Sequence, residues 1–124
     1  MRMPHRILLV EDDAISRDAL AALLVDDGYD VVAAPDGLDA LAAAARARPD
    51  LVVTDFQMPR MDAPALVARL RADPTTRAVP IIALSVDPWT APMRAATRAD
   101  VYLDKPLDVA ALSACIRSQF DRRR

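Results

Sequence analysis

Short apolar runs that end in polar residues recur along this chain, and they constrain its fold more than any other feature. We predict strands at residues 6–10, 30–34, 51–54, 79–84 and 101–103. Segments with helical periodicity separate or follow them, at residues 14–27, 37–48, 63–73 and 108–120, with a shorter one ending near residue 97. Such alternation implies parallel strands joined by right-handed crossovers. Because the runs at 6–10, 51–54 and 79–84 are continuously apolar, both faces of the sheet should be covered, which predicts a three-layer α/β sandwich.

The helical periodicity also predicts which side chains face the sheet. They are Ile15, Ala19, Leu20, Leu23 and Leu24 in the first helix, Leu38, Leu41, Ala42 and Ala45 in the second, Leu66, Val67 and Leu70 in the third, and Val109, Leu112, Ile116 and Phe120 in the last. The expected N-caps are Asp13, Asp36, Asp62 and Asp108. Pro88 and Pro92 limit the fourth helix to a short one, because an interior proline removes a backbone donor. We expect Trp89 to pack against the fold and Cys115 to lie in the core.

Ligands of parallel α/β sheets bind beyond the carboxyl ends of the strands. This chain places Glu11, Asp12, Asp55, Ser85 and Lys105 there, each at or just after the end of a predicted strand. Lys105 is the only lysine among 16 basic residues, the others being arginine. A compact ammonium contacts a small anion differently from a planar guanidinium, which indicates a specific role at this position.

Three carboxylates in one crevice repel one another, so either one is protonated or a cation lies among them. Oxygen donors without a neighbouring His or Cys favour Mg²⁺, with Mn²⁺ as the substitute. The only histidine, His5, is expected at the surface. With Ser85 and Lys105 on the other side, the crevice would neutralise the oxygens of a phosphoryl group in transfer. Asp55 is the predicted nucleophile, and it would form an acyl phosphate.

The overall composition excludes several other classes. A net charge of −2 provides no basic field for direct binding to nucleic acid or an anionic membrane. No apolar stretch approaches the length of a membrane span. The single cysteine cannot form an internal disulfide, which agrees with a reducing compartment. We expect a cytoplasmic protein.

Several stretches of this sequence match one family in order and spacing. They are ILLVEDD (7–13), GYDV (28–31), DG (36–37), DLVVTD (50–55), MP (58–59), MD (61–62), IIALS (81–85) and YLDKP (102–106). Together they resemble the receiver domain of bacterial two-component response regulators, of the chemotaxis-type single-domain architecture. The resemblance covers residues 1–121, leaving 122–124 as a basic tail or the start of a linker.

The resemblance implies a flavodoxin-like (βα)5 fold with strand order 2-1-3-4-5. It implies that Asp55 receives its phosphoryl group from a histidine kinase, a histidine phosphotransfer protein or a small acyl phosphate. The main-chain carbonyl of Gln57 would join Glu11, Asp12 and Asp55 around Mg²⁺. Ser85 and Tyr102 would form the switch. The surface of the fourth helix, fifth strand and fifth helix would then report the state to an output protein, or serve a homodimer.

The sequence departs from the family pattern near the site. Val86 stands where a small residue is usual, so we expect slower phosphoryl exchange than with alanine there. Gln57 and Asp87 are the other positions expected to tune access and dephosphorylation. Ala63 and Arg98 replace glycines that are common in the family, and the segment from 85 to 105 is about two residues shorter than usual.

The expected function is thus a phosphorylatable switch that catalyses only its own phosphorylation and dephosphorylation. A first alternative is a phosphohydrolase of the haloacid dehalogenase type, in which Glu11 would stand where that family has its nucleophilic aspartate. The second is a receiver-like module that binds proteins without being phosphorylated, which the irregular fourth helix keeps open.

Overall fold

A computed structural model describes residues 4–123 and places five parallel strands in one sheet. The strands are β1 (Arg6–Val10), β2 (Asp30–Ala34), β3 (Leu51–Asp55), β4 (Ile81–Ser85) and β5 (Val101–Asp104). Their spatial order is β2-β1-β3-β4-β5, and every neighbouring pair is parallel. The predicted strand order and fold class are confirmed.

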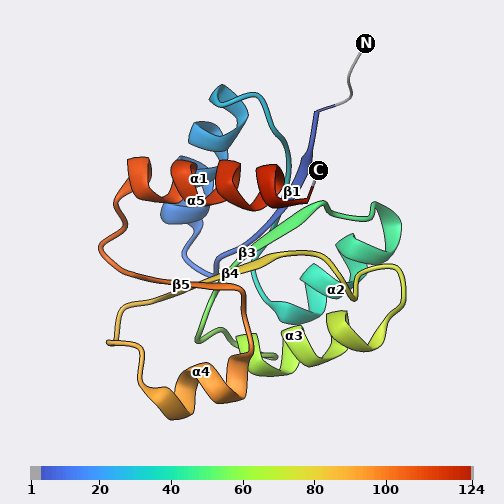
Figure 1. Ribbon diagram of the computed structural model, residues 1–124, viewed down its shortest axis with the longest axis vertical. Helices are drawn as coiled ribbons and strands as arrows, with labels where there is room; N and C mark the ends of the chain where they lie inside the picture. Colours follow the sequence, from blue (N-terminus) through green and yellow to red (C-terminus); the bar gives the residue numbers. More distant parts are fainter. Residues whose placement is uncertain (1–3, 124) are drawn as a thin grey trace.

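Helices cover both faces of this sheet (Figure 1). They are α1 (Ala14–Asp26), α2 (Gly37–Arg46), α3 (Ala63–Ala72), α4 (Ala91–Thr97) and α5 (Val109–Arg122). Helices α1 and α5 lie on one face, and α2, α3 and α4 lie on the other (Figure 1). The side chains of the central strands alternate between two apolar cores, so that Leu8 and Val52 face α2 and α3 while Leu9 and Val53 face α1 and α5. Central strands buried on both faces give the carboxyl edge of the sheet a rigid base.

Each helix begins at a side chain that caps it. The predicted caps are confirmed: Asp13, Asp36, Asp62 and Asp108 each accept a hydrogen bond from a backbone N–H in the first turn of their helix. Thr90 caps α4 in the same way by accepting from the Met93 N–H at 3.2 Å. These caps satisfy donors that the helix cannot satisfy internally, and they fix where the loops from the strands end.

The predicted inward faces of α1 and α2 were partly wrong. In α1 the core residues are Leu20 and Leu24, whereas the Ile15 side chain is 82% exposed and Leu23 is 41% exposed. In α2 the buried residues are Gly37, Ala40, Ala43 and Ala44, while Leu38, Ala42 and Ala45 are exposed. The approach of α2 to its neighbours requires small side chains, because a Cβ on Gly37 would lie 2.7 Å from the Met61 Cβ. An alanine-rich helix has no unique apolar stripe, so the sequence did not reveal this face.

Smaller differences occur at the element ends. Strand β4 begins at Ile81, two residues later than expected, and α2 ends at Arg46, two residues earlier. Helix α5 extends past Phe120 to Arg122, and its Val109 is 40% exposed where we expected an inward side chain. Of the predicted basic tail, Arg124 lies outside the described residues. Cys115 is half-buried against the core on the α1 and α5 side.

Arg98 shows why glycine is common at its position. It ends α4 in the left-handed conformation, with φ 57° and ψ 44°. A side chain in this conformation costs roughly 1 kcal/mol relative to glycine. Among the described residues, no helix is both long enough and apolar enough to span a bilayer.

Candidate functional site

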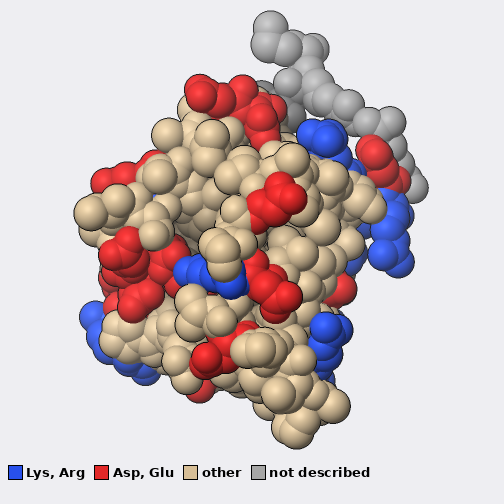
Figure 2. All heavy atoms as spheres, turned by 90° about the vertical axis from the view of Figure 1, so that its left-hand side faces the viewer, with Lys and Arg blue, Asp and Glu red and all other residues tan. Residues whose placement is uncertain are grey.

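A crevice of about 210 Å³ opens at the carboxyl ends of β1, β3 and β4. Its lining residues are Glu11, Asp12, Asp13, Ser16, Asp55, Phe56, Gln57, Leu84, Ser85, Val86 and Lys105. Figure 2 views the molecule from the side of Figure 1 on which the strands end, and acidic side chains there surround a small basic patch. The structure therefore brings together all five strand-end residues that the sequence singled out.

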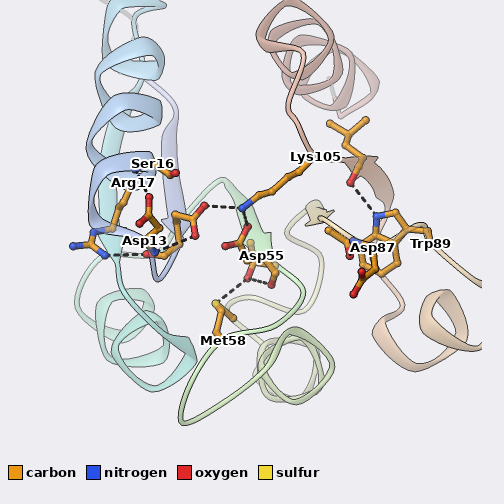
Figure 3. Close-up of polar contacts among 12 residues, drawn as sticks. Asp13, Ser16, Arg17, Asp55, Met58, Asp87, Trp89 and Lys105 are labelled. Carbon is orange, nitrogen blue, oxygen red and sulfur yellow. Dashed lines mark hydrogen bonds and ion pairs between the residues drawn. The ribbon is translucent and has the colours of Figure 1, made fainter.

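An ion-paired triad occupies the crevice. The Lys105 Nζ lies 2.7 Å from Asp55 Oδ1 and 2.8 Å from Glu11 Oε1. Both carboxylates are buried, Glu11 being 4% and Asp55 6% exposed. Figure 3 shows the lysine chain reaching across from the end of β5 to place its ammonium between the two acids. Asp55 Oδ1 has no hydrogen-bond partner, so its contact with the protein is this ion pair.

Strand pairing continues past the strands and holds these residues in place. The Glu11 N–H donates to Ala34 O, the Phe56 N–H to Leu84 O, and the Lys105 N–H to Ser85 O, at 3.0, 2.8 and 2.8 Å. The backbone at each functional side chain is thus fixed by the neighbouring strand, leaving only side-chain rotation free.

Further contacts orient Glu11. The Asp13 N–H donates to Glu11 Oε2 at 3.2 Å, and Arg17 Nη1 donates to the Glu11 backbone carbonyl at 2.9 Å. Arg17 and Ser16 are contributions of α1 that the sequence analysis missed (Figure 3). No motif marked Arg17, because its role depends on the approach of α1 to the end of β1.

The carboxylates of Glu11, Asp12 and Asp55 form a cluster that can hold a metal ion. One oxygen of each lies within 4.8 Å of the others. Asp12 is exposed and Gln57, also exposed, lines the same crevice. An all-oxygen donor set that includes the buried Asp55 carboxylate fits a hard divalent cation such as Mg²⁺.

The electrostatics of the crevice are strongly perturbed. Burial and the adjacent Glu11 carboxylate raise the pKa of Asp55 to about 8, against the opposing effect of Lys105. Burial alone would raise the pKa of Glu11, but its contacts with Asp55, Lys105 and the Asp13 N–H lower it to about 2. The pKa of Lys105 is raised, since the two carboxylates outweigh its own burial. At neutral pH in metal-free protein the carboxyl pair holds about one proton.

The loop after β4 forms one rim of the crevice. Ser85 is buried, and its Oγ accepts a hydrogen bond from the Asp87 N–H at 3.1 Å. Val86 is 71% exposed and lines the crevice, whereas Asp87 is exposed. The predicted access residues Gln57 and Val86 therefore lie at the crevice, with Asp87 next to it in sequence.

Tyr102 lies away from the crevice. Its hydroxyl donates to Arg94 O at 3.0 Å and accepts from the Ala99 N–H at 2.9 Å. Trp89 packs against its ring and also against Phe56, which follows Asp55. The expectation that Trp89 packs is confirmed, but its place between Phe56 and Tyr102 was not predicted.

A family model for the response regulator receiver domain matches residues 7–117. The chain belongs to this family. It is 39% identical to the transcriptional regulatory protein CseB of Streptomyces avermitilis over 94% of its own length and 49% of that protein. The chain spans about half the length of the first curated relatives that it matches.

Solved receiver structures agree with this assignment. The chemotaxis response regulator CheY4 of Vibrio cholerae matches with a TM-score of 0.86 and 29% identity, over 94% of this chain and 98% of that one. The receiver domain of the sensor histidine kinase PA1611 from Pseudomonas aeruginosa PAO1 matches with a TM-score of 0.85 and 30% identity, over 94% and 97%. That structure holds a magnesium ion in its active-site cleft. The family assignment removes the haloacid dehalogenase alternative.

We predict that Asp55→Asn stabilises the metal-free protein. A carboxyl whose pKa rises on folding loses stability as it ionises, here as the pH rises from the ordinary value of 3.8 towards about 8. The amide does not ionise, so the variant's advantage should be small near pH 4 and reach about 1 to 2 kcal/mol above about pH 8, after screening by solvent in the open crevice. Urea unfolding in the presence of a chelator measures this difference in the free energy of unfolding between the variant and wild type.

The exposed Asp87 supplies the matched control. Asp87→Asn should change the free energy of unfolding by less than about 0.5 kcal/mol over the same pH range. Equal stabilities of Asp55→Asn and wild type at every pH would contradict the proposed repulsion.

Proposed function

We propose that Asp55 accepts a phosphoryl group from a histidine kinase, a histidine phosphotransfer protein or a small acyl phosphate, and that its phosphorylation changes the α4-β5-α5 face for partner binding. The observation that supports this most directly is the Lys105 ammonium, 2.7 Å from a buried Asp55 oxygen that has no hydrogen-bond partner. The ammonium holds this oxygen in the crevice, and it would offset negative charge on a phosphoryl group that reacts there.

In the proposed reaction an Asp55 oxygen attacks phosphorus, and the bond from phosphorus to the donor nitrogen or oxygen breaks with its electron pair leaving on the donor. Glu11, Asp12 and Asp55, with the Gln57 carbonyl, would hold Mg²⁺, which when bound neutralises charge on the phosphoryl oxygens. Lys105 contacts one phosphoryl oxygen and Ser85 donates its hydroxyl to another. Hydrolysis of the acyl phosphate restores Asp55, and we propose no other substrate.

An apolar groove beside the crevice supports docking of the phosphodonor. It has a volume of about 300 Å³ and lies between α1 and the turn after Lys105, with Ala19, Leu23, Leu107 and Val109 among its lining residues. Ile15, 82% exposed, stands near the start of α1. We propose that a helical face of the donor protein packs on these side chains, which would bring its phosphohistidine to Asp55.

A receiver-like module that binds proteins without phosphorylation is the second candidate. The observation that favours it is the tie of the Tyr102 hydroxyl to Arg94 and Ala99, which holds this side chain away from the crevice. The short α4, of 7 residues, also departs from the family pattern. Either candidate could use the α4-β5-α5 face for an output protein or a homodimer.

Incubation with acetyl phosphate and Mg²⁺ tests the proposed function. Intact-mass analysis should show one added phosphoryl group on wild type, labile at high pH and lost when a chelator replaces Mg²⁺. Asp55→Asn should carry none. If neither acetyl phosphate nor any histidine kinase produces the adduct, the second candidate replaces the first.

Val86→Ala should accelerate phosphorylation by acetyl phosphate about threefold, because it removes bulk from the rim of the crevice. Val25→Ala is the matched control, since Val25 is 55% exposed near the far end of α1 and should leave the rate unchanged. Intact-mass analysis over time measures the rate of adduct formation in wild type and both variants. An unchanged rate in Val86→Ala would show that this side chain does not restrict access.

Ile15→Gln should slow phosphotransfer from a donor protein about tenfold while leaving the reaction with acetyl phosphate unchanged. Leu38→Gln is the control, because Leu38 is 41% exposed and also second in its helix, on the opposite face of the sheet. Transfer from a radiolabelled phosphohistidine donor measures the effect. If Ile15→Gln and Leu38→Gln slow the transfer equally, the donor protein does not dock at Ile15.

A further inference from the structure

Trp89 joins the crevice to the face that the proposed function assigns to output. Its ring centroid lies 5.2 Å from that of Phe56 and 4.7 Å from that of Tyr102, at interplanar angles of 74° and 66°. Both contacts have the edge-to-face geometry that aromatic rings favour. Phe56 follows Asp55 directly, and Tyr102 lies in β5. The indole thus stands between the residue next to the nucleophile and the predicted switch aromatic.

The Tyr102 hydroxyl is held away from the crevice. Its hydroxyl bonds with Arg94 O and the Ala99 N–H place it at the end of α4, and the Arg94 guanidinium lies 4.8 Å from its ring centroid. To move towards Ser85 it must leave these contacts and enter space next to Trp89. Because the indole packs against the Tyr102 ring, any such movement would change this contact.

The loop that carries Trp89 is attached directly to Ser85. The Asp87 N–H donates to Ser85 Oγ at 3.1 Å, and Trp89 Nε1 donates to Leu103 O at 3.0 Å. Pro88 lies between the two donors and restricts the backbone there. Figure 3 shows Asp87 and Trp89 together, on the opposite side of Lys105 and Asp55 from Asp13, with the indole nitrogen bonded to the β5 backbone.

We propose that Trp89 is a lock on the switch, holding Tyr102 outward until Ser85 turns to a phosphoryl group on Asp55. The lock rests on the proposed function. When Ser85 moves towards the phosphoryl oxygen, the Asp87 N–H loses its acceptor, and the loop must shift to satisfy that donor. The stiff segment at Pro88 carries Trp89 away from Leu103, which frees the space beside Tyr102.

The proposed lock can be measured through its effect on ligand affinity. An interaction present only in the unphosphorylated conformation lowers the apparent affinity for any ligand that binds the other conformation. Removing the indole should therefore increase affinity for beryllofluoride, which mimics a phosphoryl group on Asp55. Trp89 is also the only tryptophan of the chain, so its fluorescence reports this residue alone.

The first arm of the test is acrylamide quenching of Trp89 in wild type. Quenching should increase when beryllofluoride and Mg²⁺ are added together, and should stay unchanged with Mg²⁺ alone. In Ser85→Ala, beryllofluoride should no longer change it, because the loop has lost its connection to the phosphoryl group. Mass analysis with acetyl phosphate, in parallel, shows whether the same wild-type preparation is phosphorylated.

The second arm measures beryllofluoride binding by calorimetry at saturating Mg²⁺. Trp89→Leu should bind about tenfold more tightly than wild type, and Trp89→Phe, which keeps a ring but loses the donor to Leu103, should show a smaller gain. Wild type that forms the adduct while Trp89 quenching stays constant, or variants with wild-type affinity, would overturn the lock and leave the proposed function intact. Wild type that forms no adduct with acetyl phosphate or with a histidine kinase overturns both. If Trp89→Leu does not fold, the wild-type quenching result decides.

Discussion

The Lys105 ammonium between two buried carboxylates is the interaction on which the site depends. Glu11 and Asp55 are 4% and 6% exposed, and one oxygen of each lies within 4.8 Å of the other. If both were ionised they would repel by roughly 3 to 4 kcal/mol at an effective dielectric of about 20. Lys105 offsets this repulsion with contacts of 2.8 and 2.7 Å. A raised pKa of Asp55 shows that the compensation is incomplete. The remaining imbalance favours a divalent cation among the carboxylates of Glu11, Asp12 and Asp55.

The fold meets this electrostatic requirement through backbone pairing. Lys105 and Glu11 are 94 residues apart in sequence, yet they meet because β1, β3, β4 and β5 are neighbours in order and run in parallel. Asp55 and Ser85 are the last residues of their strands, and Glu11 and Lys105 come directly after theirs with their backbone N–H groups still bonded to the neighbouring strand. The two apolar cores pack on both faces of the sheet. The repulsion between the Glu11 and Asp55 carboxylates therefore does not displace the strands that carry them. The freedom that remains lies in the side chains and in the loop after Ser85.

The loop after Ser85 carries a proline on either side of Trp89. Two prolines shorten α4 and leave Trp89 to fill the space between Phe56 and Tyr102. The same segment is tied to Ser85 at one end and to the β5 backbone through the indole. These contacts connect Ser85 to the start of α4 and to β5. Under the proposed lock, the free energy needed to change the surface of α4 and β5 depends on Trp89 as well as on Tyr102.

The sequence by itself determined the strand positions, the helix caps and the five residues of the crevice, because these follow from local patterns and from the rule that parallel strands end at one edge. It could not determine which sides of α1 and α2 are buried: the alanine-rich α2 has several apolar faces, and α1 has more large apolar residues than the sheet can cover. Only the tertiary structure selected Ala40 over Leu38, since α2 approaches Met61 closely. It also decided that Ile15 is exposed near the start of α1 and that Trp89 packs between Phe56 and Tyr102. Those placements depend on contacts between segments distant in sequence, which no local pattern encodes.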